Sequence, residues 1–261
     1  MRRHPTETAQ ADASAQTLVP MPGRLAVISV GLLAASAAPA LAMRRSYGKR
    51  AGARFAAGSV LATLAQQFLI GVAAARKNSS LTAVDAMTLS RGVASAVLVG
   101  LLVSGVRRRN GVAGWLGWGS LVYGSIVCDW LDGPIARRLG ATSELGAVLD
   151  LESDSWLTLT AASSAATWGG LPGYCLAGPL ARYALMFAAL RRIPYAKIYA
   201  DEPPWARPFG IAQMALFTAA MAPFGAAGTR LAVRLAAPVV ATLQLVGMLL
   251  LYRRSQRTLP T

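Results

Sequence analysis

Long apolar blocks dominate this chain and restrict what it can fold into. Each block runs for about 18–24 residues, the length that a helix needs to cross a hydrocarbon core of roughly 30 Å. Hydrophobic residues make up 54% of the 261 residues and charged residues only 14%, whereas a soluble domain carries about 25% charged residues. We therefore expect an all-α, polytopic membrane protein.

The apolar blocks divide the chain into three regions. Residues 1–22 are polar and without helical periodicity, which predicts a disordered tail. Residues 23–80 hold one or two extra apolar helices of unassigned role, and residues 81–255 hold a six-helix transmembrane core. The expected helices cover Leu25–Ala42, Phe55–Ala75, Thr82–Val106, Val112–Leu131, Leu145–Trp168, Leu171–Leu190, Pro208–Pro223 and Leu231–Tyr252. Ala40-Leu41-Ala42 resembles a signal-peptidase site, but the long, sparsely basic region before it favours a retained helix.

Basic residues gather at the ends of the apolar blocks and give a formal net charge of +15. This placement is typical of contact with anionic lipid headgroups. Nucleic acid is not an expected partner, because no long basic stripe with interleaved aromatic residues occurs. With the acidic segment 128–156 in the cytoplasm, the basic stretches 44–54 and 107–109 fall outside if every block spans. The positive-inside rule therefore leaves the topology open, including a re-entrant or interfacial N-terminal block.

Six of the eleven acidic residues lie within 26 residues, at the junction of two apolar helices. They are Asp129, Asp132, Glu144, Asp150, Glu152 and Asp154. Carboxylates in a bilayer are costly and repel one another unless something positive lies among them. Asp129 and Asp132 share one helix face, as do Asp150 and Asp154, while Glu152 points away from the second pair. Two antiparallel helices would bring the two acidic faces together as a four-carboxylate cage.

The ligands in this cage favour a hard cation. Oxygen ligands suit Mg²⁺, Mn²⁺ or Ca²⁺, and the core offers no histidine and no zinc-type cysteine spacing. Gly133 and Gly146 leave room for phosphates beside the acids, although close helix packing explains glycines equally well. Arg137 suits a phosphate partner. The pattern indicates a metal–diphosphate site, and the plainer alternative is a set of helix-end acids paired with Arg137, Arg138 or lipid headgroups.

The acidic segment resembles the signature of the CDP-alcohol phosphatidyltransferases at each of its fixed positions. These positions are Asp129, Asp132, Gly133, Ala136, Arg137, Gly146, Asp150 and Asp154. The resemblance extends from about Thr82 to the C-terminus and does not cover the first 80 residues. Its implied activity is attack by an alcohol hydroxyl on a phosphorus of a CDP-linked donor, with release of CMP.

The resemblance also implies a role for each matching residue. Asp129, Asp132, Asp150 and Asp154 would bind Mg²⁺ or Mn²⁺, and Asp154 would be the general base. Gly133, Ala136, Arg137 and Gly146 would line the nucleotide pocket. Thr88 and Arg91 resemble a Thr-x-x-Arg element that contacts the same ligand. The family further implies CDP-diacylglycerol as the donor, a small alcohol as the acceptor, membrane lipids as surroundings and a homodimer.

Further expectations concern Arg182, the cellular location and the alternative functions. Arg182 lies inside an apolar helix, so it is a candidate for binding a phosphate of the acceptor or lipid, or for a salt bridge with one of the aspartates. We expect the inner (plasma) membrane of a bacterium, with the site on the cytoplasmic side. Two other functions stay open: an intramembrane Mg²⁺-dependent prenyltransferase and a divalent-cation channel or transporter.

Overall fold

Helices form every element in the part of the chain that the structure describes. The computed structural model describes residues 21–74, 83–106, 112–138, 144–189, 206–224 and 226–257. The helices are α2 (Met21–Tyr47), α3 (Lys49–Ala74), α4 (Ala83–Val103), α5 (Val112–Arg138), α6 (Glu144–Trp168), a 3₁₀ turn η1 (Gly173–Leu176), α7 (Ala177–Ala189), α9 (Ala206–Met221) and α10 (Ala227–Arg257). The predicted all-α class is therefore confirmed for these residues. Of the predicted tail 1–22, only Met21 and Pro22 are described, in the first turn of α2.

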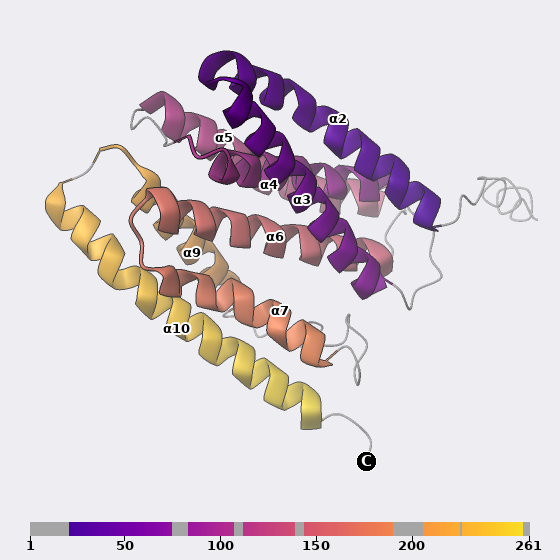
Figure 1. The fold of residues 1–261 in the computed structure, drawn as a ribbon. Coiled ribbons are helices and arrows are strands. Elements are labelled where there is room, and N and C mark those ends of the chain that lie inside the picture. The colour runs from indigo at the N-terminus through magenta and orange to yellow at the C-terminus, as the bar shows by residue number, and fades with distance from the viewer. Residues whose placement is uncertain are drawn as a thin grey trace, which may run out of the picture.

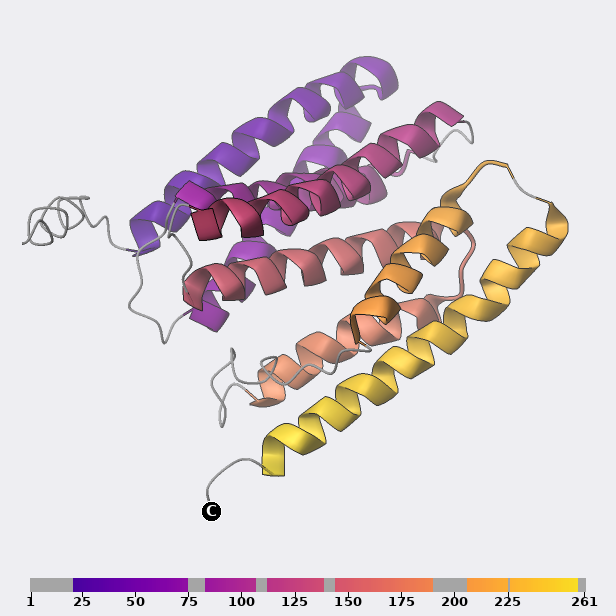
Figure 2. The ribbon, with the colours of Figure 1, turned by 180° about the vertical axis from the view of Figure 1, so that it is seen from behind.

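The helices form one bundle in which α6 is central (Figure 1). α6 contacts α3, α4, α5, α7, α9 and η1. Both views place α2 at one edge of the bundle and α10 at the opposite edge (Figure 2). The main core joins apolar side chains of helices that precede and follow α6, from α4 to α10, among them Leu98, Trp118, Ala161, Phe217 and Ala237. Helices that carry the acidic segment are thus held from both sides.

Among the residues that the structure describes, two helices are long and apolar enough to cross a membrane by length and composition, over Lys49–Val72 and Ala227–Leu250. Large apolar side chains along α10 are exposed, including Leu231, Leu235 and Val239. Such a surface is unfavourable in water and suits a hydrocarbon environment.

The N-terminal helices pack against α4 through small and polar residues. A Cβ added at Gly58 would lie 2.9 Å from Val103 Cβ, and one added at Gly92 would lie 2.4 Å from Gln66 Oε1, so α3 and α4 run antiparallel. The Ser59 hydroxyl donates to the Ala96 carbonyl at 3.0 Å across this interface. Small residues permit such close approach between membrane helices. Residues outside the resemblance are therefore an integral part of the bundle.

Candidate active site

Arg91 of α4 joins three acidic side chains from two other helices. Its Nη1 donates to Asp129 Oδ1 of α5 at 2.5 Å and to Asp154 Oδ1 of α6 at 2.6 Å. Its Nη2 donates to Asp150 Oδ1, also of α6. Charge-assisted bonds of this kind are stronger than neutral ones. One guanidinium therefore fixes the relative position of α4, α5 and α6 at this level of the bundle.

Helical spacing explains why the acids meet here. Asp150 and Asp154 are one turn apart and occupy one face of α6, and the second half of α5 brings Asp129 opposite them. The Arg91 side chain is 1% exposed, whereas those of Asp129, Asp150 and Asp154 are 30%, 49% and 47% exposed. The guanidinium thus forms the floor of the site, and the carboxylates form its accessible rim.

The charges and ligand atoms fit a divalent cation. Asp129, Asp150 and Asp154 each offer one carboxylate oxygen, and these oxygens lie within 4.8 Å of one another. Three carboxylates and one guanidinium leave a formal charge of −2 when all are ionised. Oxygen ligands with excess negative charge match the preference of Mg²⁺ and Mn²⁺. A cation bound by these oxygens would compete with Arg91 for the same carboxylates.

The other predicted site residues lie close to this cluster along the chain. Thr88 is buried one turn before Arg91, and its carbonyl accepts a bond from Arg91 Nε at 3.4 Å. Arg137 is exposed in the last turn of α5. The backbone of α5 carries Asp132, Gly133 and Ala136, and the first turn of α6 carries Gly146, but these four side chains fall outside the described ones. Three of the four predicted metal ligands are therefore seen together.

Arg182 reaches α6 from α7. Its Nη2 donates to the Leu151 carbonyl at 2.8 Å, one residue beyond Asp150.

Glu152 lies on a different side of α6 and is only 1% exposed. It is absent from the group of clustered carboxylates in the described part of the chain. The prediction that Glu152 points away from Asp150 and Asp154 agrees with this geometry.

Sequence reasoning missed the central position of Arg91. The sequence predicted that something positive must lie among the acids, and it assigned Arg91 to the nucleotide instead. An arginine within an otherwise apolar helix was the available signal. It also missed Gln66 of α3, which is 1% exposed and packs over Gly92, the residue after Arg91. No spacing rule links residue 66 to residue 92, because their proximity depends on helix packing.

Comparison with known proteins identifies the family. The model of the CDP-alcohol phosphatidyltransferase family matches residues 81–252, which is more than half of the chain. The chain therefore belongs to this family, as its acidic signature predicted. The matched region begins just before α4 and ends within α10, so it includes Arg91 and all three clustered aspartates. No curated protein and no solved structure matched the chain.

Proposed function

From this family membership we propose that the chain transfers a phosphatidyl group from CDP-diacylglycerol to a small alcohol in phospholipid biosynthesis. The family itself implies a CDP-alcohol donor, an alcohol acceptor and phosphatidyl transfer. The observation that supports the assignment of the site is the meeting of Asp129, Asp150 and Asp154 around Arg91. In the reaction, a bond forms between the acceptor oxygen and phosphorus, the bond to CMP breaks, and the hydroxyl proton must be removed.

Asp129, Asp132 and Asp150, together with Asp154, would hold Mg²⁺ or Mn²⁺. The cation would neutralise the diphosphate and stabilise CMP as the leaving group. Asp154 would take the proton from the acceptor hydroxyl, because its carboxylate lies at the exposed rim where an alcohol can approach.

Arg91 would exchange partners when the donor binds. Its guanidinium engages the same three carboxylates that a cation needs, so a loaded site frees it to bind a phosphate oxygen. Gly133, Ala136, Arg137, Gly146 and Thr88 would line the nucleotide pocket around it. In this proposal the arginine first joins the three carboxylates and then contributes to donor binding.

Arg182 would bind a phosphate on the acceptor or on the lipid. Its contact with the Leu151 carbonyl holds the guanidinium beside the Asp150–Asp154 face of α6. A phosphorylated alcohol bound there would present its hydroxyl toward Asp154. This role gives the chain a means to select among acceptors.

The proposed setting is a membrane. The family is membrane-integral, and the two long apolar helices agree with this. We propose that α4, α5, α6, α7, α9 and α10 form the six-helix transmembrane core. The site would open to the cytoplasm of a bacterial inner membrane, and the enzyme would act as a homodimer.

Release of CMP tests the assignment. Purified protein with Mg²⁺, CDP-diacylglycerol and a panel of alcohols should release CMP with at least one acceptor. Asp150→Asn and Asp154→Asn should each abolish this release while gel filtration and circular dichroism match wild type. Wild-type turnover in either variant would refute the assigned roles. Transfer of a prenyl diphosphate would indicate a prenyltransferase instead, and cation uptake into liposomes without CMP release would indicate a channel or transporter.

A further inference from the structure

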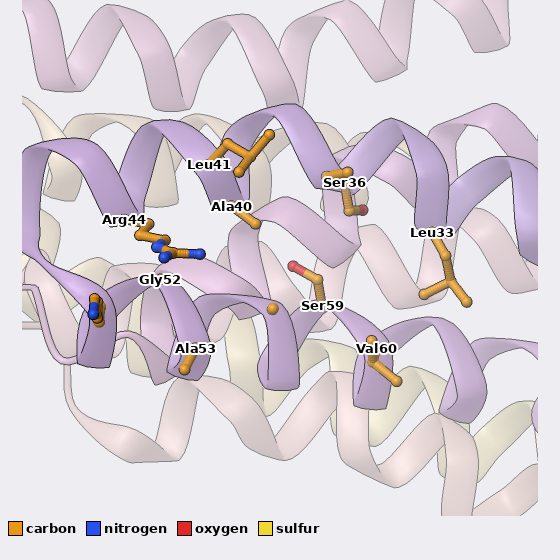
Figure 3. Close-up of a pocket in the computed structure, with 12 residues that line it drawn as sticks. Leu33, Ser36, Ala40, Leu41, Arg44, Gly52, Ala53, Ser59 and Val60 are labelled. Atoms are coloured by element: carbon orange, nitrogen blue, oxygen red, sulfur yellow. The ribbon is translucent and has the colours of Figure 1, made fainter.

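A groove of about 680 Å³ lies between α2 and α3, the two helices that precede the family region (Figure 3). Its walls include Leu33, Ala37 and Ala40 from α2 and Ala53 and Val60 from α3. The wall along α2, from Leu33 to the groove's basic end at residue 44, is about 16 Å long at 1.5 Å per residue. This is close to half of a hydrocarbon core of roughly 30 Å, so the groove has the depth of one lipid leaflet.

The hydroxyl groups inside the groove are already hydrogen-bonded, so they do not need water or a polar ligand. Its wall includes two hydroxyls, on Ser36 and Ser59. The first donates to the Leu32 carbonyl and the second to the Ala96 carbonyl, each at 3.0 Å. With both hydroxyls bonded to the backbone, the remaining wall suits hydrocarbon and not a hydrated ligand.

One end of the groove is strongly basic. Gly48, with a φ of +92°, makes the one-residue turn between the two helices and brings Arg44 and Lys49 to the same end. Both residues are exposed, and Arg44 extends into the space between the helices above Gly52 (Figure 3). The sequence contains no aspartate or glutamate from residue 13 to residue 84. Nothing in this part of the chain neutralises the two cations.

The basic end lies at the opposite end of the bundle from the candidate active site. Gly105, just beyond the end of α4, lies beside Arg54, with Nη1 3.2 Å from where a Cβ would be. Arg91 lies in the first half of the same helix, about 21 Å along its axis from Gly105 at 1.5 Å per residue. The basic end of the groove is therefore separate from the acidic site. With that site on the cytoplasmic side, as proposed above, the basic end belongs to the other membrane surface, where the positive-inside rule predicts few basic residues.

We propose that this groove binds one acyl chain of an anionic phospholipid from the leaflet opposite the active site. The chain lies between α2 and α3, and the headgroup phosphate lies against Arg44 and Lys49. Charge complementarity selects an anionic headgroup, and the apolar wall of one-leaflet depth selects a lipid over a free phosphate. The bound lipid explains basic residues on a surface where orientation rules do not predict them.

Lipid selectivity in nanodiscs tests the proposal. The full-length protein, without CDP donor, is titrated with spin-labelled phosphatidylglycerol or spin-labelled phosphatidylcholine of the same acyl chains. The motionally restricted fraction should favour phosphatidylglycerol by about fivefold or more, the order expected for one to two basic residues at an anionic headgroup. Arg44→Gln with Lys49→Gln should remove this preference. The matched control, Arg45→Gln with Arg50→Gln, removes two neighbouring charges outside the groove wall and should retain it.

A second pair of variants tests the groove itself. Ala37→Phe fills the wall and should lower the restricted fraction, whereas Ala38→Phe, an exposed neighbour outside the wall, should leave it unchanged. Equal restriction of the two lipids by wild type would overturn the proposal. An equal loss of preference in both charge variants would also overturn it, because general surface charge would then suffice. Inorganic phosphate competing as well as the lipid would exclude the acyl-chain component.

Discussion

Replacing Arg91 with methionine removes the guanidinium that joins the three carboxylates and leaves a shorter, unbranched apolar side chain. The clustered oxygens lie within 4.8 Å of one another. With an effective dielectric constant of about 20, each pair of unit charges at that distance repels by about 3.5 kcal/mol. Three pairs give roughly 10 kcal/mol if nothing moves.

The measured loss should be smaller, because the aspartates are 30–49% exposed and can turn toward water or take up a proton. Breaking a buried ion pair costs about 3–5 kcal/mol, and exposure of the carboxylates places this site at the lower end of that range. A loss of about 3 kcal/mol corresponds to a fall of roughly 6–12 °C in Tm for a domain of this size.

Thermal unfolding in detergent with EDTA measures this loss. Arg138→Met is the matched control, since Arg138 is exposed at the end of α5 and should shift Tm by little. Magnesium at a fixed concentration, about 100 times its Kd for the Arg91→Met variant, should return about 2.7 kcal/mol to that variant. Wild type should gain less, because its Arg91 already pairs with the same carboxylates. Equal Tm values for the two variants in EDTA, or no rescue by magnesium, would refute the competition between Arg91 and a cation.

Two further predictions concern acceptor choice and helix packing. Arg182→Gln should raise KM for phosphorylated acceptors about tenfold or more while KM for uncharged alcohols stays constant; steady-state assays on both classes decide this, and a KM that is unchanged for every acceptor ends the assignment. Gly100→Ala would place a Cβ 2.4 Å from Ser59 Oγ and 2.9 Å from the Phe55 carbonyl oxygen, so unfolding should become easier by about 1–3 kcal/mol. Gly71→Ala, with nothing within 4 Å, should be neutral or stabilising by about 0.5–1 kcal/mol; similar melting curves for these two variants would show that the α3–α4 contact is looser than described.

Helix positions were largely predictable because apolar blocks of fixed length carry their own signal. The expected Leu145–Trp168 and Phe55–Ala75 correspond to α6 and α3 within a few residues at most ends. The pairing of Asp150 with Asp154 followed from the helical period alone. Such features depend on residues close in sequence, which is why a single chain is enough to find them.

Contacts between helices were not predictable in the same way. The sequence predicted four clustered acids and a cation among them, but it did not choose Arg91 over Arg137 or Arg138 as their partner. It also gave no reason to place Gln66 over Gly92, or Arg182 on the Leu151 carbonyl. Which side chains meet depends on where along their lengths the helices pack against one another. Small residues at the interfaces permit that close packing.

By itself, the sequence determined the helical class, the acidic signature, the family and the kind of ligand that the acids suit. Periodicity, hydropathy and the chemistry of oxygen ligands are local properties that can be assessed from the sequence alone. Only the tertiary structure decided that one buried guanidinium joins α4, α5 and α6, and that the two N-terminal helices enclose a groove with a basic end. Both results require side chains far apart in the chain to meet, and packing in three dimensions, not spacing along the chain, decides which of them do.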